Sequence, residues 1–241
     1  MALKERDFVE VDYTGTLAHG VIFDTTSADL AKKHNLNLKS PYKPVTICIG
    51  EQQILKGIDK FLVGKEVGKP YQVKLSPEES FGAKDPKEIR LVPLRTFQKQ
   101  KVQPVPGLQV DIDGTVATVL RVSSGRVLVD FNHPLSGKEV MYEVTVRRQI
   151  TDKKEQIESF MKLVLPAKLD VNVQGDKATI KAPALPKEVT DVIGKKISEL
   201  TGVAVEFVVD PAAQSVHSHE GHSPGHSHEG HSHAGHEHHQ H

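Results

Sequence analysis

The sequence predicts an α+β protein: an antiparallel sheet with one helix, a small β domain inserted into it, a separate α+β module and a disordered His-rich tail. Three observations support this fold class. Residues 1–83 combine short alternating strands with one amphipathic helix. Residues 84–131 are rich in proline and β-branched residues, which favours short strands over long helices. Residues 151–212 follow the order α-β-β-α-β, and residues 213–241 hold almost nothing that can be buried.

The first domain begins with alternating apolar residues. They predict one strand from Phe8 and others over 45–49 and 71–75. Between the last two strands, a helix over 54–63 is predicted by a stripe that consists of Ile54, Leu55, Ile58 and Leu62. We expect Ser27 to be the N-cap of a shorter helix that follows it.

The inserted segment, residues 84–131, interrupts this domain. Its valines supply strand material, and turn signals at 113–114 and 124–125 separate the runs. We interpret it as a small, mostly β domain. Residues 140–146 again alternate between apolar and polar side chains, so we expect the returning chain to close the first sheet. The first domain then comprises residues 1–83 and 132–150.

The C-terminal module, residues 151–212, carries two helical patterns around a predicted hairpin. We expect Thr151 to cap the first helix and Gly202 to end the second. Nothing in its residues points to chemistry. A partner surface and a dimer contact both remain open.

Composition argues against several classes of function. Basic and acidic residues number 31 each, so the net charge implies no nucleic-acid or membrane partner. No apolar run approaches the roughly 20 residues that span a bilayer, and the N-terminus lacks the apolar region of a signal peptide. The single cysteine, Cys48, lies in an apolar strand, where we expect a buried and unreactive thiol. These features favour a cytoplasmic protein in a reducing compartment.

Five short elements follow one another in a distinctive order. They are VDYTGTL at 11–17, FD at 23–24, IGEQQILKG at 49–57, SPEESFG at 76–82 and NHPLSGK at 132–138. In this order and spacing they resemble the groove of the FKBP-type peptidyl-prolyl cis-trans isomerases, which are known for binding macrolides. The insertion after 76–82, together with the last element, resembles the SlyD-like proteins and the long archaeal FKBPs. The resemblance implies an isomerase that acts on X–Pro bonds.

The resemblance also assigns site residues. It implies a catalytic set that consists of Tyr13, Phe23, Asp24 and Tyr142. It implies a substrate-binding set that consists of Val45, Ile54, Leu55, Ile58 and Phe81. Taken singly, the aromatic residues could equally be sheet core. Ile58 stands where many members have Trp, and Phe81 replaces a Tyr. Both changes keep the surface apolar but remove polar groups, which weighs against tight macrolide binding more than against catalysis.

The implied chemistry needs no nucleophile, metal or cofactor. An X–Pro bond resists rotation by roughly 18–20 kcal/mol because amide resonance keeps it planar. The planar form is strongly dipolar, so a pocket that removes water disfavours it relative to the twisted form, which the pocket can also bind by shape. We expect Asp24 to be the polar anchor near the rotating carbonyl, with Tyr13 bonded to it or to the substrate.

The resemblance implies that the insert binds unfolded or partly folded polypeptides through exposed apolar surface. Its many valines could equally be ordinary sheet core. The insert carries no residues suited to bond chemistry.

The tail is rich in histidine. Eleven imidazoles lie one to four residues apart: His217, His219, His222, His226, His228, His231, His233, His236, His238, His239 and His241. Neutral imidazoles suit Ni, Zn and Cu. A purification tag is the alternative, but interspersed Glu, Ser and Gly favour a natural tail. SlyD-like proteins are known for metal-binding His-rich tails, which supports nickel or zinc, although this tail lacks the Cys that theirs usually contain.

Three functions therefore compete. The first is a prolyl isomerase that also helps proteins to fold, with X–Pro polypeptides as partners. The second is a metal-binding accessory protein that delivers nickel and uses the isomerase fold as a scaffold. The third is a holdase with an inactive groove.

Overall fold

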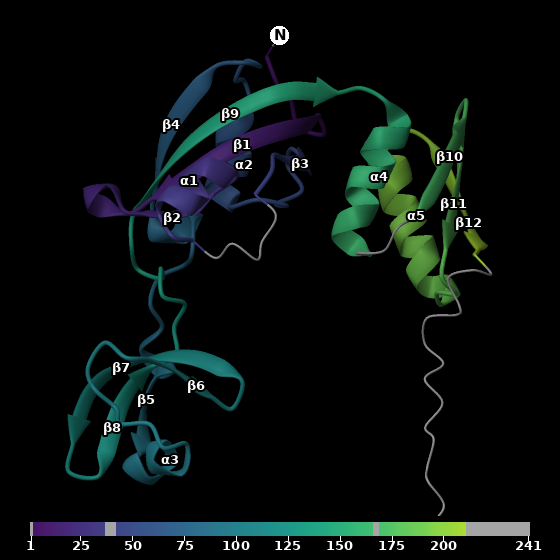
Figure 1. Ribbon diagram of the computed structural model, residues 1–241. Coiled ribbons are helices and arrows are strands. Elements are labelled where there is room, and N and C mark those ends of the chain that lie inside the picture. The colour runs from purple at the N-terminus through teal and green to yellow at the C-terminus, as the bar shows by residue number, and fades with distance from the viewer. Residues whose placement is uncertain (1, 37–41, 166–168, 211–241) are drawn as a thin grey trace, which may run out of the picture.

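The computed structural model describes residues 2–36, 42–165 and 169–210, which form three sheets (Figure 1). The first sheet has five strands in the order β2-β1-β9-β4, with β3 paired to β1 as well. All of its pairings are antiparallel. The strand bounds are β1 Phe8–Thr16, β2 Ile22–Thr25, β3 Val45–Cys48, β4 Pro70–Leu75 and β9 Val140–Ile150. The predicted closure of this sheet by the returning chain is confirmed, because β9 lies between β1 and β4.

Short helices join these strands. They are the 3-10 turn Ala18–Gly20, α1 Ala28–Lys33, α2 Lys56–Leu62 and the 3-10 turn Pro77–Glu79. Ser27 caps α1 as predicted, because its side chain accepts a hydrogen bond from the Leu30 amide. Helix α2 buries Ile58 and Leu62 against the sheet. It begins later than predicted, since Ile54 and Leu55 belong to the loop that leads into it.

The inserted segment forms a four-stranded antiparallel sheet in the order β5-β8-β7-β6. Its elements are the 3-10 turn Pro86–Glu88, β5 Ile89–Pro93, α3 Leu94–Lys99, β6 Gln109–Ile112, β7 Thr115–Ser123 and β8 Arg126–Asp130. Both predicted turns are present, with positive φ at Asp113 and Ser124. Helix α3 was not predicted. It begins after Pro93, which is a suitable residue before a first helical turn, and buries Phe97 in the core of the insert.

Two chain segments connect the insert to the first sheet, and they are bonded to each other. The Lys84 ammonium lies 2.7 Å from the Asp130 carboxylate, which is 6% exposed. The Asn132 side chain accepts from the Asp85 amide at 2.8 Å and donates to the Asp85 carbonyl at 3.0 Å. In Figure 1 the insert lies away from the other two sheets at the end of this neck.

The C-terminal module has the predicted order α-β-β-α-β. Its elements are α4 Lys153–Val164, β10 Asp170–Gln174, β11 Lys177–Ala182, α5 Lys187–Thr201 and β12 Ala204–Val209. Gly202 ends α5 at φ 73°, as predicted. The prediction that Thr151 caps α4 was wrong. Asp152 is the N-cap, because its carboxylate accepts from the Glu155 amide at 2.8 Å and also carries the charge that a helix N-terminus favours.

The module packs directly against the first sheet. Phe8, Cys48 and Ile150 of that sheet are buried in one apolar cluster with residues of α4 and α5, including Ile157 and Ile197. Cys48 is buried, as expected, and burial raises the pKa of its thiol to about 12, which disfavours the reactive thiolate.

The His-rich tail, residues 213–241, lies outside the described residues. Within the part of the chain that is described, no helix is both long and apolar enough to cross a membrane.

Candidate active site

A cavity of about 230 Å³ opens on the face of the first sheet that α2 covers. It is lined by Tyr13, Asp24, Val45, Thr46, Ile47, Gln53, Ile54, Leu55, Phe81, Tyr142 and Leu163. Strands β1, β2, β3 and β9 supply six of these residues, and the loop before α2 supplies three more. Aliphatic and aromatic side chains therefore dominate the walls, and Asp24 is the one ionisable carboxyl among the lining residues.

Aromatic rings build the part of the site next to β1 and β9. The ring of Tyr142 meets those of Tyr13 and Phe23 edge to face, each with centroids 5.8 Å apart. Phe23 also meets Phe81 at 5.8 Å. Gly15 makes this arrangement possible. It pairs with Tyr142 across the strands, and a Cβ at Gly15 would lie 2.8 Å from ring carbons of Phe23 and Tyr142.

The polar part of the site is the pair formed by Tyr13 and Asp24. Burial raises the pKa of the Asp24 carboxyl, while hydrogen bonds from the Thr25 amide and the Tyr13 hydroxyl act in the opposite direction. Burial and the neighbouring Asp24 charge raise the pKa of Tyr13 to about 12. Burial, together with the Asp24 charge, also raises the pKa of Tyr142. Both tyrosines are therefore protonated at neutral pH, and the Tyr13 hydroxyl is the donor in its bond to Asp24.

A side chain of α2 holds the loop that precedes this helix. The Asp59 carboxylate is buried and accepts hydrogen bonds from the Gly50 and Gln52 amides, both at 2.9 Å. Gln52 has φ 52°, a backbone conformation that these bonds help to fix. The Gln53 side chain accepts from the Cys48 amide at 2.7 Å, which ties the same loop to β3. These contacts position Ile54 and Leu55 at the cavity.

Phe81 is held by the segment that returns from the insert. The Ser136 hydroxyl donates to the Phe81 carbonyl at 3.0 Å. The His133 ring stacks on the Phe81 ring with centroids 4.8 Å apart and an angle of 3° between the planes. The Gly137 amide donates to the Gly82 carbonyl at 2.8 Å. The position of Phe81 therefore depends on both chain segments that lead to the insert.

The structure brings most of the residues expected from the sequence to this cavity. Seven of them line it: Tyr13, Asp24, Val45, Ile54, Leu55, Phe81 and Tyr142. Phe23 contributes through its ring contacts, and Ile58 is fully buried in the apolar core with which the cavity residues pack.

Four lining residues were not expected. Thr46, Ile47 and Gln53 are sequence neighbours of expected residues, so the strand and loop assignments could have found them. Leu163 comes from α4 of the C-terminal module, and no sequence signal connects it to the groove.

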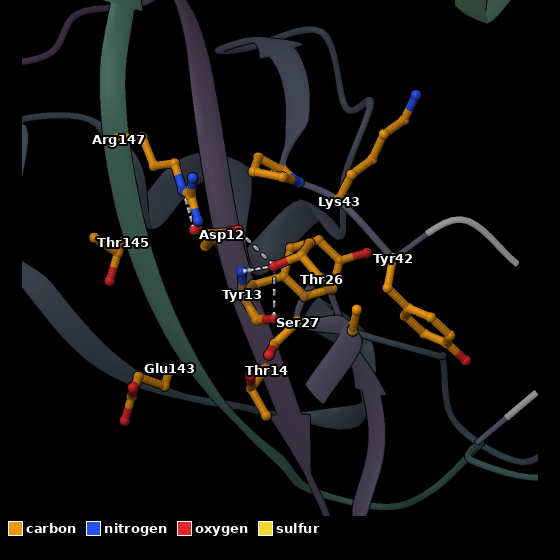
Figure 2. Close-up of a pocket in the computed structure, with 12 residues that line it drawn as sticks. Asp12, Tyr13, Thr14, Thr26, Ser27, Tyr42, Lys43, Glu143, Thr145 and Arg147 are labelled. Carbon is orange, nitrogen blue, oxygen red and sulfur yellow. Dashed lines mark hydrogen bonds and ion pairs between the residues drawn. The ribbon is translucent and has the colours of Figure 1, made fainter. Parts of the chain in front are cut away.

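A second cavity, of about 480 Å³, is polar (Figure 2). In it Asp12 forms an ion pair with Arg147 and accepts a hydrogen bond of 2.8 Å from the Thr26 hydroxyl. The Thr26 hydroxyl oxygen in turn accepts from the Tyr13 amide at 3.1 Å. These groups are engaged in joining β1, β9 and the segment after β2, which explains their arrangement in structural terms.

Comparison with known proteins agrees with this geometry. Residues 1–98 match the family described as FKBP-type peptidyl-prolyl cis-trans isomerase, and residues 90–135 match the family described as the FKBP26 IF domain. The chain is 30% identical over 146 residues to a short-type peptidyl-prolyl cis-trans isomerase of Methanocaldococcus jannaschii, covering 60% of this chain and 92% of that protein.

Two SlyD isomerases are also similar. The SlyD protein of Aeromonas hydrophila is 28% identical over 149 residues, which are 61% of this chain and 64% of that protein. The SlyD protein of Haemophilus influenzae is 27% identical over 150 residues, which are 61% of this chain and 72% of that protein.

The chain belongs to the FKBP-type peptidyl-prolyl cis-trans isomerases, the class that the apolar cavity and its sheet define. Its insert matches the FKBP26 IF domain, and its substrates are proline-containing polypeptides.

Proposed function

We propose that the 230 Å³ cavity is the catalytic groove and that it acts on X–Pro bonds of unfolded or partly folded polypeptides. In this proposal Tyr13, Phe23, Asp24 and Tyr142 form the catalytic set. Of the substrate-binding set, Val45, Ile54, Leu55 and Phe81 contact the substrate, and the fully buried Ile58 supports them from the core. One observation carries it: a predominantly apolar cavity contains a single carboxyl group that is bonded to a tyrosine hydroxyl.

The proposed mechanism follows from the amide group. The planar X–Pro amide has a larger dipole than the twisted form, so removing its water raises the free energy of the planar form more. The rings of Tyr13 and Tyr142 remove that water, and Phe23 supports the Tyr142 ring through an edge-to-face contact. Asp24 is the polar anchor near the rotating carbonyl, and the Tyr13 hydroxyl fixes the direction of its carboxylate. No covalent bond forms or breaks, so catalysis requires no cofactor.

We further propose that the chain divides into an isomerase domain (1–83 and 132–150), an insert (84–131), a C-terminal domain (151–212) and a tail (213–241).

We also propose that the insert binds client chains. The valines of the insert are of two kinds. Val119 and Val127 are fully buried sheet core. Other apolar side chains are exposed, and these are Leu91 at 59%, Val105 at 49%, Val116 at 55%, Leu120 at 39% and Val122 at 38%. The exposed set is the proposed client surface.

The test compares two substrates. Replacing residues 84–131 with a short loop is expected to keep activity on a small prolyl peptide and to reduce activity sharply on a protein whose refolding is limited by proline isomerisation. Weak client contacts raise the local concentration of prolyl bonds near the groove, and only the protein substrate is long enough to use them. Equal loss on both substrates would mean that the insert supports the groove instead of binding clients.

A matched pair of variants avoids removing the insert. Leu91→Ser combined with Val116→Ser changes two exposed side chains of the proposed client surface. Val192→Ser changes a side chain that is 69% exposed on α5, outside the insert. We expect only the double variant to slow catalysed refolding of the protein substrate.

The second candidate function is metal binding by the tail, as an accessory or nickel-delivery protein. The observation that favours it is the set of eleven histidines after residue 216. We propose that they bind Ni²⁺ or Zn²⁺ through neutral imidazoles. We also propose a reducing, cytoplasmic location, which the lone buried thiol of Cys48 supports.

A further inference from the structure

One wall of the proposed groove comes from a different part of the chain. Leu163 lies in the last turn of α4, and it lines the same cavity as Val45, Gln53 and Ile54. Its side chain is not fully covered, because the residue is 54% exposed. A large apolar side chain that is half open at the edge of a peptide groove is available for contact with a bound peptide.

Helix α4 is fixed to the first sheet, so Leu163 has a defined position. The Gln156 side chain donates to the Ile150 carbonyl at 2.7 Å, in a buried bond. Arg148 of β9 forms an ion pair with Glu155. Two residues before Leu163, Met161 is buried in the cluster that α4 shares with the first sheet.

A second contact fixes the module from α5. The Lys196 ammonium lies 2.7 Å from the carboxylate of Glu51, in the loop before α2. The loop that supplies Gln53 and Ile54 and the module that supplies Leu163 are therefore joined by an ion pair as well as by the shared core.

The cavity has two distinguishable ends. Asp24 and Phe81 lie towards β2 and the neck of the insert, since Phe23, next to Asp24, meets the Phe81 ring. Val45 and Gln53 lie towards β3, and α4 packs against β3. Leu163 therefore belongs to the end remote from the neck.

We propose that a peptide binds with the carbonyl before proline at Asp24 and the following residue at this second end, so that Leu163 forms a specificity subsite for a bulky apolar side chain on the residue that follows the proline. The proposal rests on the cavity being the catalytic groove. It gives the C-terminal module a part in substrate selection: burial of an apolar side chain against Leu163 favours Pro-Leu and Pro-Phe sequences over Pro-Gly.

The test uses the full chain and capped peptides of the form Ala-Ala-Pro-Xaa-Ala. Exchange NMR measures the rate of cis-trans isomerisation of each peptide, without a coupled protease. Leu163→Ala is expected to lower kcat/KM about fivefold when Xaa is Leu, as loss of part of an apolar contact does, and to leave it unchanged when Xaa is Gly. Val164→Ala is the matched control, because Val164 is the next residue of α4, is 45% exposed and does not line the cavity.

Three results would overturn the subsite: equal loss on the Leu and Gly peptides, no loss on either, or the same loss with Val164→Ala. A peptide series that varies the residue before proline should respond equally in wild type and Leu163→Ala, and a selective response there would also contradict the proposal. Asp24→Ala on the Gly peptide tests the groove separately, because its effect does not depend on Leu163. Melting temperatures of both α4 variants show whether folding is intact.

Discussion

The Tyr13 hydroxyl donates a hydrogen bond to the Asp24 carboxylate, and burial affects both groups. Burial raises the pKa of the tyrosine to about 12, so the tyrosine keeps its proton, whereas the hydrogen bond it donates lowers the pKa of the carboxyl against the effect of burial. The pair therefore holds an oriented carboxylate in an otherwise apolar cavity.

Asp24 is expected to make activity depend on pH. The pKa of its carboxyl is raised above 3.8, so the folded protein binds more protons than the unfolded chain just above that pH. The contribution of Asp24 to stability therefore falls as pH rises through this window, while the proposed anchor becomes ionised and the peptide rate rises. Asp24→Asn should remove both dependences. Its rate should be about tenfold lower at neutral pH, which corresponds to about 1.4 kcal/mol.

The measurements for Asp24 are kcat/KM on a prolyl peptide and the melting temperature, each followed from about pH 4 to pH 7. Tyr13→Phe is the matched variant. It removes the hydrogen bond that lowers the pKa of Asp24, so its rate profile should shift to higher pH. An unchanged peptide rate in Asp24→Ala would show that this anchor is assigned wrongly.

Tyr142 is expected to serve both catalysis and stability. The residue is 1% exposed, and its ring contacts Tyr13 and Phe23. Tyr142→Ala should lower the free energy of unfolding by about 3–5 kcal/mol, as for other large aromatic truncations, and should also lower the peptide rate. Tyr142→Phe keeps the ring and should preserve most of the stability. Urea unfolding and peptide kinetics measure the two effects, and a fully stable, inactive Tyr142→Ala would contradict its packing role.

Asp59 is expected to act on the groove through the loop that it holds. Asp59→Ala leaves the Gly50 and Gln52 amides without their acceptor, which should cost about 1–3 kcal/mol of folding free energy. Because Ile54 and Leu55 follow in this loop, KM for the peptide should rise as well. Asp59→Asn keeps one acceptor and should show a smaller change. If KM stays constant while stability falls, the loop does not depend on Asp59 for its position in the folded protein.

Metal binding is expected to require the tail. An imidazole binds metal when neutral, and its ordinary pKa is about 6.5, so Ni²⁺ or Zn²⁺ should bind at about pH 7.5 and be released before about pH 5. In the described ranges, no group of three or more His, Cys, Asp or Glu residues is arranged to hold a metal ion. Calorimetry on the full chain and on residues 1–216 measures this. Strong metal binding by the shorter chain would instead place the metal site in the folded part. As a control, isomerase activity should be equal in the two chains.

Much of the fold could be predicted from local pattern. Alternation located β1, β4 and β9, and the helical stripe located α2, because their apolar faces pack against one core. Helix boundaries were less predictable. Asp152 and Thr151 are both good caps, and only the bond to the Glu155 amide distinguishes them.

The residues of the candidate site also differ in how far the sequence could locate them. Tyr13, Asp24 and Tyr142 could be placed because their motifs keep a fixed order along the chain. Leu163 could not, since its place at the cavity results from packing between two modules, which depends on Phe8, Cys48 and Ile150 being covered by α4 and α5.

That packing has a consequence for anyone who wishes to shorten the protein. Phe8, Cys48 and Ile150 are now at most 2% exposed. In a chain that ended after Ile150, these three side chains would form a solvent-exposed apolar patch on the first sheet. The insert can be exchanged with less damage, because its core is its own. A minimal version of this isomerase therefore needs polar substitutions at Phe8, Cys48 and Ile150 before the C-terminal module can be dispensed with.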